Sequence, residues 1–163
     1  MTFIANRSLP EGSYSFREVF SGLDNVEPLI NCMGDASTLR NILDRTRVTL
    51  KDKDGYMYVN DEDGSLVVGL EYLQNGEESH LYLDVIHELV HVKQFLQGCN
   101  LFDPRYSYVD RPTEIEAYRC CIEEGRKIGM SEQAIGEYLY VEWISKTDHV
   151  RLLRKLRVKE IPP

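Results

Sequence analysis

The pattern of apolar and polar residues changes its period part-way along the chain. Three segments, 47–51, 56–60 and 65–73, alternate apolar with polar residues or are rich in β-branched ones, which is typical of strands. Turn-forming residues at 53–55 and 61–64 separate them. The pattern therefore predicts a three-stranded antiparallel meander within residues 47–73.

From there to the end, apolar residues recur at helical spacing. Four helices are predicted: one that begins between Ser79 and Asp84 and ends at Gly98, one from Pro112 to Ile128, one capped by Ser131, and one that follows Thr147 or Asp148. Before the strands, we expect a short helix around 14–20 and a longer one from the N-cap Ser37 to Arg45. Because strands precede helices and no linker divides the chain, we predict an α+β fold in one domain, 1–163.

The composition narrows the classes of function. The 163 residues carry a formal net charge of −8 and have a sequence pI near 5.0, which argues against a nucleic-acid partner because clustered Lys and Arg bind phosphates. No stretch approaches the roughly 18 apolar residues of a membrane span, and the first residues lack the pattern of a secretion signal. We therefore expect a cytoplasmic protein without a membrane partner. Its four cysteines form no CxxC pair and are expected to be reduced, mostly buried thiols.

An HExxH motif lies inside the first helix of the second half. It is formed by His87, Glu88 and His91. The apolar residues around it recur at i, i+4, i+7 and i+11, and they are Val85, Leu89, Val92 and Leu96. This spacing defines a stripe that faces the core, so the motif is expected on an amphipathic helix.

The motif predicts a zinc site with hydrolytic chemistry. Residues four apart lie about 40° apart around a helix, so His87 and His91 can offer imidazole nitrogens to one Zn²⁺. Glu88 is turned too far round the helix to be a good ligand. It can instead take a proton from a water activated by the metal, which would make Glu88 the general base.

A catalytic zinc site normally has three protein ligands and one position open for water. The short-spacer pattern HExxHxxGxxH would need glycine at position 94 and histidine at position 97, where this chain has Gln94 and Gln97. The third ligand is therefore sought on the next helix, where Glu114 and Glu116 compete. Steps of three and four from Glu114 reach small, apolar or aromatic residues, whereas the same steps from Glu116 reach mostly charged ones.

Glu114 is thus predicted to point inward as the third ligand, and Glu116 to point to water. A buried carboxylate requires a partner, and Zn²⁺ would satisfy it. The alternative is an ion pair between Glu114 and an arginine, Arg111 or Arg119.

These residues resemble the gluzincin group of zinc peptidases, in which a glutamate from a later helix joins HExxH. The match covers roughly residues 80–125 and consists of His87, Glu88, His91, Glu114 and Ala117. The resemblance implies a small zincin-like fold, with the sheet over the HExxH helix and an edge strand that binds an extended peptide substrate. It also implies cleavage of peptide bonds.

The chain departs from that group in one position. Many members carry Asp four residues after the third ligand, where it orients a ligand histidine, and this chain has Tyr118. The residue that orients the histidines is therefore open, with Asp84, Asp110 and Glu116 as candidates. The donor for the developing oxyanion is open as well, and its candidates are Tyr106, Tyr108, Tyr118, Arg111 and His149.

Two other functions fit the same motif. The metal could have a structural role, or a terminal segment could close the site, in a latent or regulatory protein with a metallopeptidase-like fold; a protein side chain in the fourth position would mark that case. A hydrolase acting on another amide is the second, because HExxH specifies the attacking water and leaves the acyl group open.

Overall fold

In the computed structural model, residues 2–53 and 55–160 are described, and they form an α+β fold. The strands are β1 (Ile4–Ala5), β2 (Gly12–Ser15), β3 (Phe20–Ser21), β4 (Arg47–Lys51), β5 (Met57–Val59) and β6 (Leu66–Gly69). The helices are α1 (Phe16–Val19), α2 (Glu27–Met33), α3 (Ala36–Arg45), α4 (Leu70–Asn75), α5 (Glu78–Leu96), α6 (Pro112–Lys127), α7 (Glu132–Tyr138), α8 (Lys146–Leu156) and a 3₁₀ turn, η1 (Tyr108–Asp110).

The sheet differs from the predicted meander. Its order is β2-β4-β6-β5, and β4 pairs with β6 in parallel, Val48 opposite Leu66, so β5 does not lie between them. The antiparallel pairing of β5 with β6 is as predicted. The physical reason lies in burial. All residues of β6 are buried, as a central strand requires, whereas β5 is short and exposes Tyr58, which suits an edge.

Two segment limits were also wrong. The predicted strand 65–73 ends at Gly69, and α4 follows it directly. The predicted helix 14–20 is helical only over Phe16–Val19, because β2 before it pairs with β4. The predicted turn 53–55 includes Asp54, which is outside the described residues.

The helices follow the prediction more closely. Helices α5, α6 and α7 lie where expected, although α5 begins at Glu78, slightly before the predicted start. Helix α8 also begins early, at Lys146. The N-cap of α3 is Asp35 in place of the predicted Ser37, because the Asp35 carboxylate accepts the Thr38 amide at 2.7 Å. Helix α2 was not predicted.

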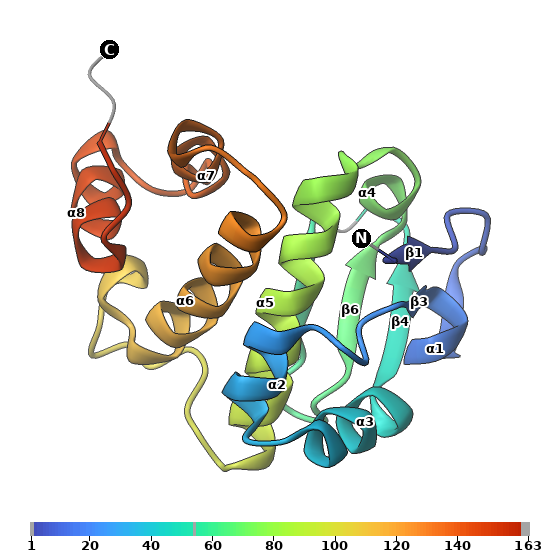
Figure 1. The fold of residues 1–163 in the computed structure, drawn as a ribbon. Helices are drawn as coiled ribbons and strands as arrows, with labels where there is room; N and C mark the ends of the chain where they lie inside the picture. The colour runs from blue at the N-terminus through green and yellow to red at the C-terminus, as the bar shows by residue number, and fades with distance from the viewer. Residues whose placement is uncertain (1, 54, 161–163) are drawn as a thin grey trace.

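Helix α5 lies at the centre of the molecule, between the sheet on one side and α6 on the other (Figure 1). It is buried on nearly all sides from Leu81 to Gln94. The predicted apolar stripe is confirmed at its first three positions, whereas Leu96 is exposed at the end of the helix. The layers therefore place the HExxH residues where the sheet and α6 meet α5.

No disulfide links the cysteines among the described residues. Cys120 and Cys121 are buried, Cys32 is half-buried and Cys99 is exposed. In residues 2–53 and 55–160, no helix is long and apolar enough to cross a membrane.

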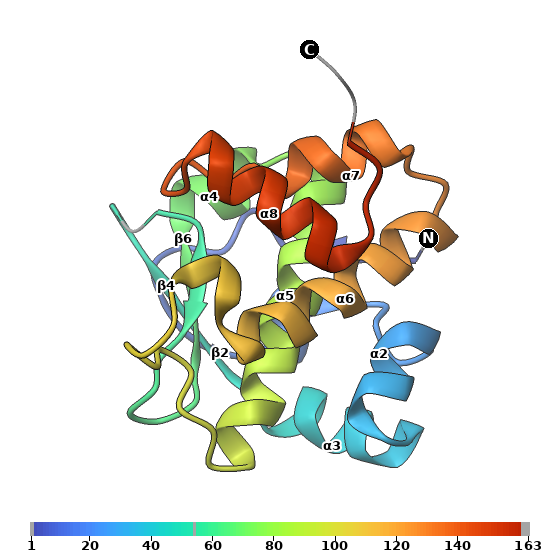
Figure 2. The same ribbon diagram turned by 90° about the vertical axis from the view of Figure 1, so that its left-hand side faces the viewer.

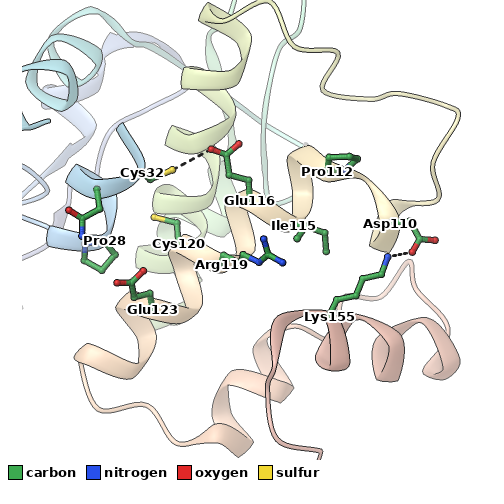
Figure 3. A pocket seen from close by; sticks show the side chains of 11 residues that line it. Pro28, Cys32, Asp110, Pro112, Ile115, Glu116, Arg119, Cys120, Glu123 and Lys155 are labelled. Atoms are coloured by element: carbon green, nitrogen blue, oxygen red, sulfur yellow. Dashed lines mark hydrogen bonds and ion pairs between the residues drawn. The ribbon is translucent and has the colours of Figure 1, made fainter. Parts of the chain in front are cut away.

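Helix α8 packs across α6 and η1 (Figure 2). Asp110, at the end of η1, accepts hydrogen bonds from Lys155 and from Arg151 at 2.9 Å; the contact with Lys155 is drawn in Figure 3. The bonds from Lys155 and Ser107 lower the pKa of Asp110 to about 2. These contacts hold the C-terminal helix against the segment that leads into α6.

Replacing Asp110 should make the stability less dependent on acid pH. A carboxyl group whose folded pKa lies below its unfolded value, about 3.9, stabilises above that value and loses the effect as pH falls toward the folded pKa. We expect Asp110→Asn to lower the free energy of unfolding at pH 7 by at most about 1 kcal/mol, since the pair is partly exposed. Urea denaturation at pH 7 and pH 3 should show a smaller difference at pH 3; an equal difference at both would contradict this assignment.

Candidate metal centre

Helix α5 presents His87 and His91 side by side at the interface with α6. Their Nε2 atoms lie 3.0 Å apart, and both side chains are 6% exposed. The four-residue spacing places them on one helix face, as predicted. Two imidazole nitrogens at this distance can share one cation.

The first turn of α6 brings Glu114 to the same point. Its Oε2 lies 3.0 Å from His87 Nε2 and 3.5 Å from His91 Nε2, and the side chain is buried. Ligands about 2.05 Å from a tetrahedral Zn²⁺ are roughly 3.3 Å apart. The separations of the three atoms, 3.0 to 3.5 Å, are compatible with such a site, and two imidazoles and a carboxylate are ligands that zinc accepts.

Charge compensation holds this group together. Burial disfavours the His91 cation, yet the Glu114 and Glu88 carboxylates raise the pKa of His91 to about 9. Burial likewise opposes ionisation of Glu114, and bonds from both histidines nevertheless hold the pKa of Glu114 well below its usual range. The carboxylate is therefore stabilised by the same two rings that would share a metal with it.

Glu88 lies beside the donor atoms, close enough to act as a ligand or as a base. One atom each from His87, Glu88 and His91 lie within 4.8 Å of one another. Glu88 is 8% exposed, and burial raises its pKa to about 7, with no hydrogen bond among the causes. A carboxyl group with this pKa can both accept and return a proton near neutral pH.

Gln94 orients His91. His91 Nδ1 lies 2.7 Å from Gln94 Oε1 and can donate its hydrogen there, so Nε2 is the nitrogen that faces Glu114 and His87 and would ligate a metal once deprotonated. The Gln94 amide is itself held, because its Nε2 donates to the Thr113 carbonyl at 3.0 Å and to Glu116 Oε2 at 2.8 Å. This role was not predicted; the sequence signal was a polar residue three positions after His91, on the same face of α5.

Glu116 is not near the metal-binding atoms. The expectation that it points to water holds in part: the side chain is 44% exposed, and it also pairs with Lys93 and accepts from Gln94. Figure 3 shows it beside Cys32, where it lines a second cavity of about 690 Å³ between α2 and α6. Of the three candidates for the residue that orients a histidine, Glu116 thus acts indirectly, because it holds Gln94, which contacts His91.

The other two candidates have different partners. Asp84 accepts hydrogen bonds from the hydroxyls of Tyr72 and Tyr138, and Asp110 is bound to α8. His87 Nδ1 has no partner among the described residues. No residue described here therefore orients His87 by a hydrogen bond to Nδ1.

Removing the Gln94 amide should weaken metal binding while leaving the ligands in place. Residues that orient a ligand histidine typically contribute 10- to 100-fold to metal affinity. We expect Gln94→Ala to raise the zinc dissociation constant by about that factor, measured by competition with a chromogenic chelator. Gln97→Ala is the matched control, because Gln97 is exposed at the C-cap of the same helix. Equal affinities for the two variants would contradict the role given to Gln94.

The donor atoms open into a pocket of about 640 Å³ that lies between α5, β5 and the α7 end of the molecule. Tyr108 and Tyr118 line it, with their hydroxyls 2.7 Å apart, and the Tyr118 ring lies 4.4 Å from that of His87. Both remain candidates for the oxyanion donor.

The other three candidates for that donor are absent from the described pocket wall. Tyr106 is exposed in the loop before η1. His149 bonds the Gly136 carbonyl, and the Arg111 guanidinium lies 6.0 Å over the Tyr108 ring. Arg111 reaches the pocket only through Tyr108, and the structure gives no ion pair between Glu114 and Arg111 or Arg119 among the described residues.

Comparisons with models of protein families, with curated proteins and with solved structures found no match for this chain. The resemblance to gluzincins therefore stays a prediction from the sequence motif.

Proposed function

We propose that this protein is a zinc-dependent hydrolase that cleaves peptide bonds. The observation that carries the proposal is the convergence of His87 Nε2, His91 Nε2 and Glu114 Oε2 within 3.5 Å at the floor of an open pocket. A nearly buried carboxyl group, Glu88, with a pKa of about 7 stands beside them. This combination supplies three zinc ligands and one base, as hydrolytic zinc sites require.

The residues divide the chemistry among them. Zn²⁺, when bound, would polarise the scissile carbonyl and lower the pKa of a water molecule toward about 7. Glu88 takes the proton of the attacking water and later returns it to the leaving amine. Tyr108 and Tyr118 can donate a hydrogen bond to the oxyanion from the pocket wall.

Strand β5 favours the proposal that the substrate is a peptide. It is an edge strand and lines the pocket. The Gly69 amide donates to the Tyr56 carbonyl and the Asn60 amide to the Ser65 carbonyl, so the even-numbered residues bond β6. By strand periodicity, Met57 and Val59 direct their backbone N–H and C=O groups away from β6. An extended peptide can pair with that free edge by strand addition.

The pocket wall favours an open site over a latent one. A latent site would have a terminal segment across the metal, yet the described pocket wall contains no residue before Tyr56 or after Trp143. No cysteine is part of that wall either. A metal held by His87, His91 and Glu114 would have the Glu88 carboxylate beside it and, among the described residues, would face a pocket with room for water or substrate.

Metal analysis and a peptidase assay test the proposal together. The purified wild type should contain about one zinc ion per chain and should cleave an unstructured protein, and a chelator should abolish cleavage. Zinc without cleavage would favour the latent or structural alternative. Absence of zinc after incubation with the metal would refute the metal centre.

A further inference from the structure

Exposed aromatic side chains gather at the pocket of the proposed metal centre. Six large aromatic residues are exposed among the described residues, and five of them line this pocket: Tyr56, Tyr58, Phe102, Tyr140 and Trp143. Trp143, the single tryptophan of the chain, is 55% exposed. Exposed aromatic surface grouped around a cavity is typical of a binding site and not of a solvated surface.

The rings form a continuous series from the rim to the histidines. Tyr56 lies 6.3 Å from Trp143, and Trp143 lies 5.6 Å from Tyr108 in an edge-to-face arrangement. Tyr108 bonds Tyr118, whose ring lies against His87. A group bound over Trp143 is therefore in the same pocket as the proposed scissile bond.

The pocket is also acidic and has no lysine or arginine in its described wall. Besides the carboxyl groups at the metal centre and Asp84, the wall contains Glu137 and Glu142. Both side chains are exposed, and neither is paired with Lys or Arg among the described residues; Glu137 accepts from Gln133, and Glu142 accepts from the Tyr56 hydroxyl at 2.7 Å. Elsewhere in the chain many carboxylates are paired with Lys or Arg, including Asp24, Asp110 and Glu132.

We propose that this rim selects substrates with a basic side chain, arginine or lysine, near the cleaved bond. The inference rests on the proposed function and gives it a substrate class. A cation over Trp143 and Tyr56 gains cation–π attraction, and Glu142, which Tyr56 holds in place, supplies the counter-charge. The flat guanidinium of arginine stacks on aromatic faces better than the ammonium of lysine, so arginine is preferred.

Trp143 provides a direct probe of binding. We would titrate zinc-loaded Glu88→Gln, which leaves the peptide intact, with N-acetylated and C-amidated Ala-Arg-Ala and follow Trp143 fluorescence. Two other peptides are compared with it. One is the neutral N-acetylated and C-amidated Ala-Gln-Ala, and the other is Ala-Ala-Ala with free termini. We expect the arginine peptide to bind roughly five- to tenfold more tightly than either, and less tightly at 1 M salt.

Charge removal at the rim should reduce the preference. In the same background, the pair Glu137→Gln with Glu142→Gln should bind the arginine peptide at most about threefold more tightly than the glutamine peptide, because only the cation–π attraction of Trp143 and Tyr56 is left. The control Glu11→Gln, an exposed carboxylate outside the described pocket wall, should keep the difference. Equal binding of the two capped peptides to the parent would overturn the proposal. Tight binding of the uncapped alanine peptide would overturn it too, because the cation recognised would then be a peptide N-terminus.

Hydrolysis is measured separately with the zinc-loaded wild type. If arginine peptides bind selectively but are not cleaved, the rim assignment stands and the hydrolase proposal fails. If capped arginine and glutamine peptides are cleaved with equal kcat/KM and bind equally, the hydrolase proposal stands and the rim assignment fails.

Discussion

Glu88→Gln is expected to retain about one zinc ion per chain and to lose peptidase activity by about 10²- to 10⁴-fold in kcat, the range typical of a lost general base. The amide preserves the shape of the side chain but cannot take a proton from water. The three proposed ligands are unchanged, so zinc content should equal that of the wild type. The measurement pairs metal analysis with kcat on a fluorogenic peptide.

The stability of this variant is part of its test. Glu88 is nearly buried and makes no hydrogen bond that affects its pKa, so a neutral amide of equal size should not destabilise the fold strongly. A melting temperature close to that of the wild type would show that lost activity reflects lost chemistry. Activity within about threefold of the wild type, with zinc bound, would remove Glu88 from the mechanism.

The second large effect is expected at Glu114. Glu114→Ala removes one of three proposed ligands and should weaken zinc binding by more than about 100-fold, beyond the range for residues that only orient a ligand. Peptidase activity should fall with the bound metal. Chelator competition measures the affinity, and activity at saturating zinc separates lost binding from lost catalysis.

Glu116→Ala is the matched control, because Glu116 lies two residues away on the same helix and contacts Gln94 instead of the donor atoms. Glu116→Ala should reduce zinc affinity by no more than the 10- to 100-fold expected for Gln94→Ala, because loss of Glu116 only leaves the Gln94 side-chain amide less constrained. A greater loss for Glu116→Ala than for Glu114→Ala would reverse the assignment of the third ligand. Thermal melts of the zinc-free proteins are needed for both, because removal of one partner from a buried charge cluster costs about 3–5 kcal/mol.

Much of the helical half could be predicted from the sequence because its signals are local. The limits of α6 follow from Pro112 at its first turn and from its apolar spacing, and α7 begins at its Ser131 cap, whose hydroxyl accepts the Ala134 amide. The sheet could not be predicted in the same way. Whether β4 pairs with β5 or with β6 depends on which strand is covered on both faces, and that depends on helices distant in sequence.

The features of the candidate site likewise divide into those that the sequence predicts and those that depend on tertiary structure. That His87 and His91 share a face, and that Glu114 points inward, is fixed by helix periodicity alone, which depends on positions within one helix. That Glu114 Oε2 meets both rings, that Gln94 orients His91, and that aromatic rings from β5 to Trp143 form the rim are consequences of how α5, α6 and the sheet pack. The sequence by itself determined which residues are candidates to bind a metal and which chemistry they would support. Tertiary structure decided the pairing of strands, the contacts around the proposed ligands and the surface of the pocket beside them, because these depend on distances between segments that no local pattern encodes.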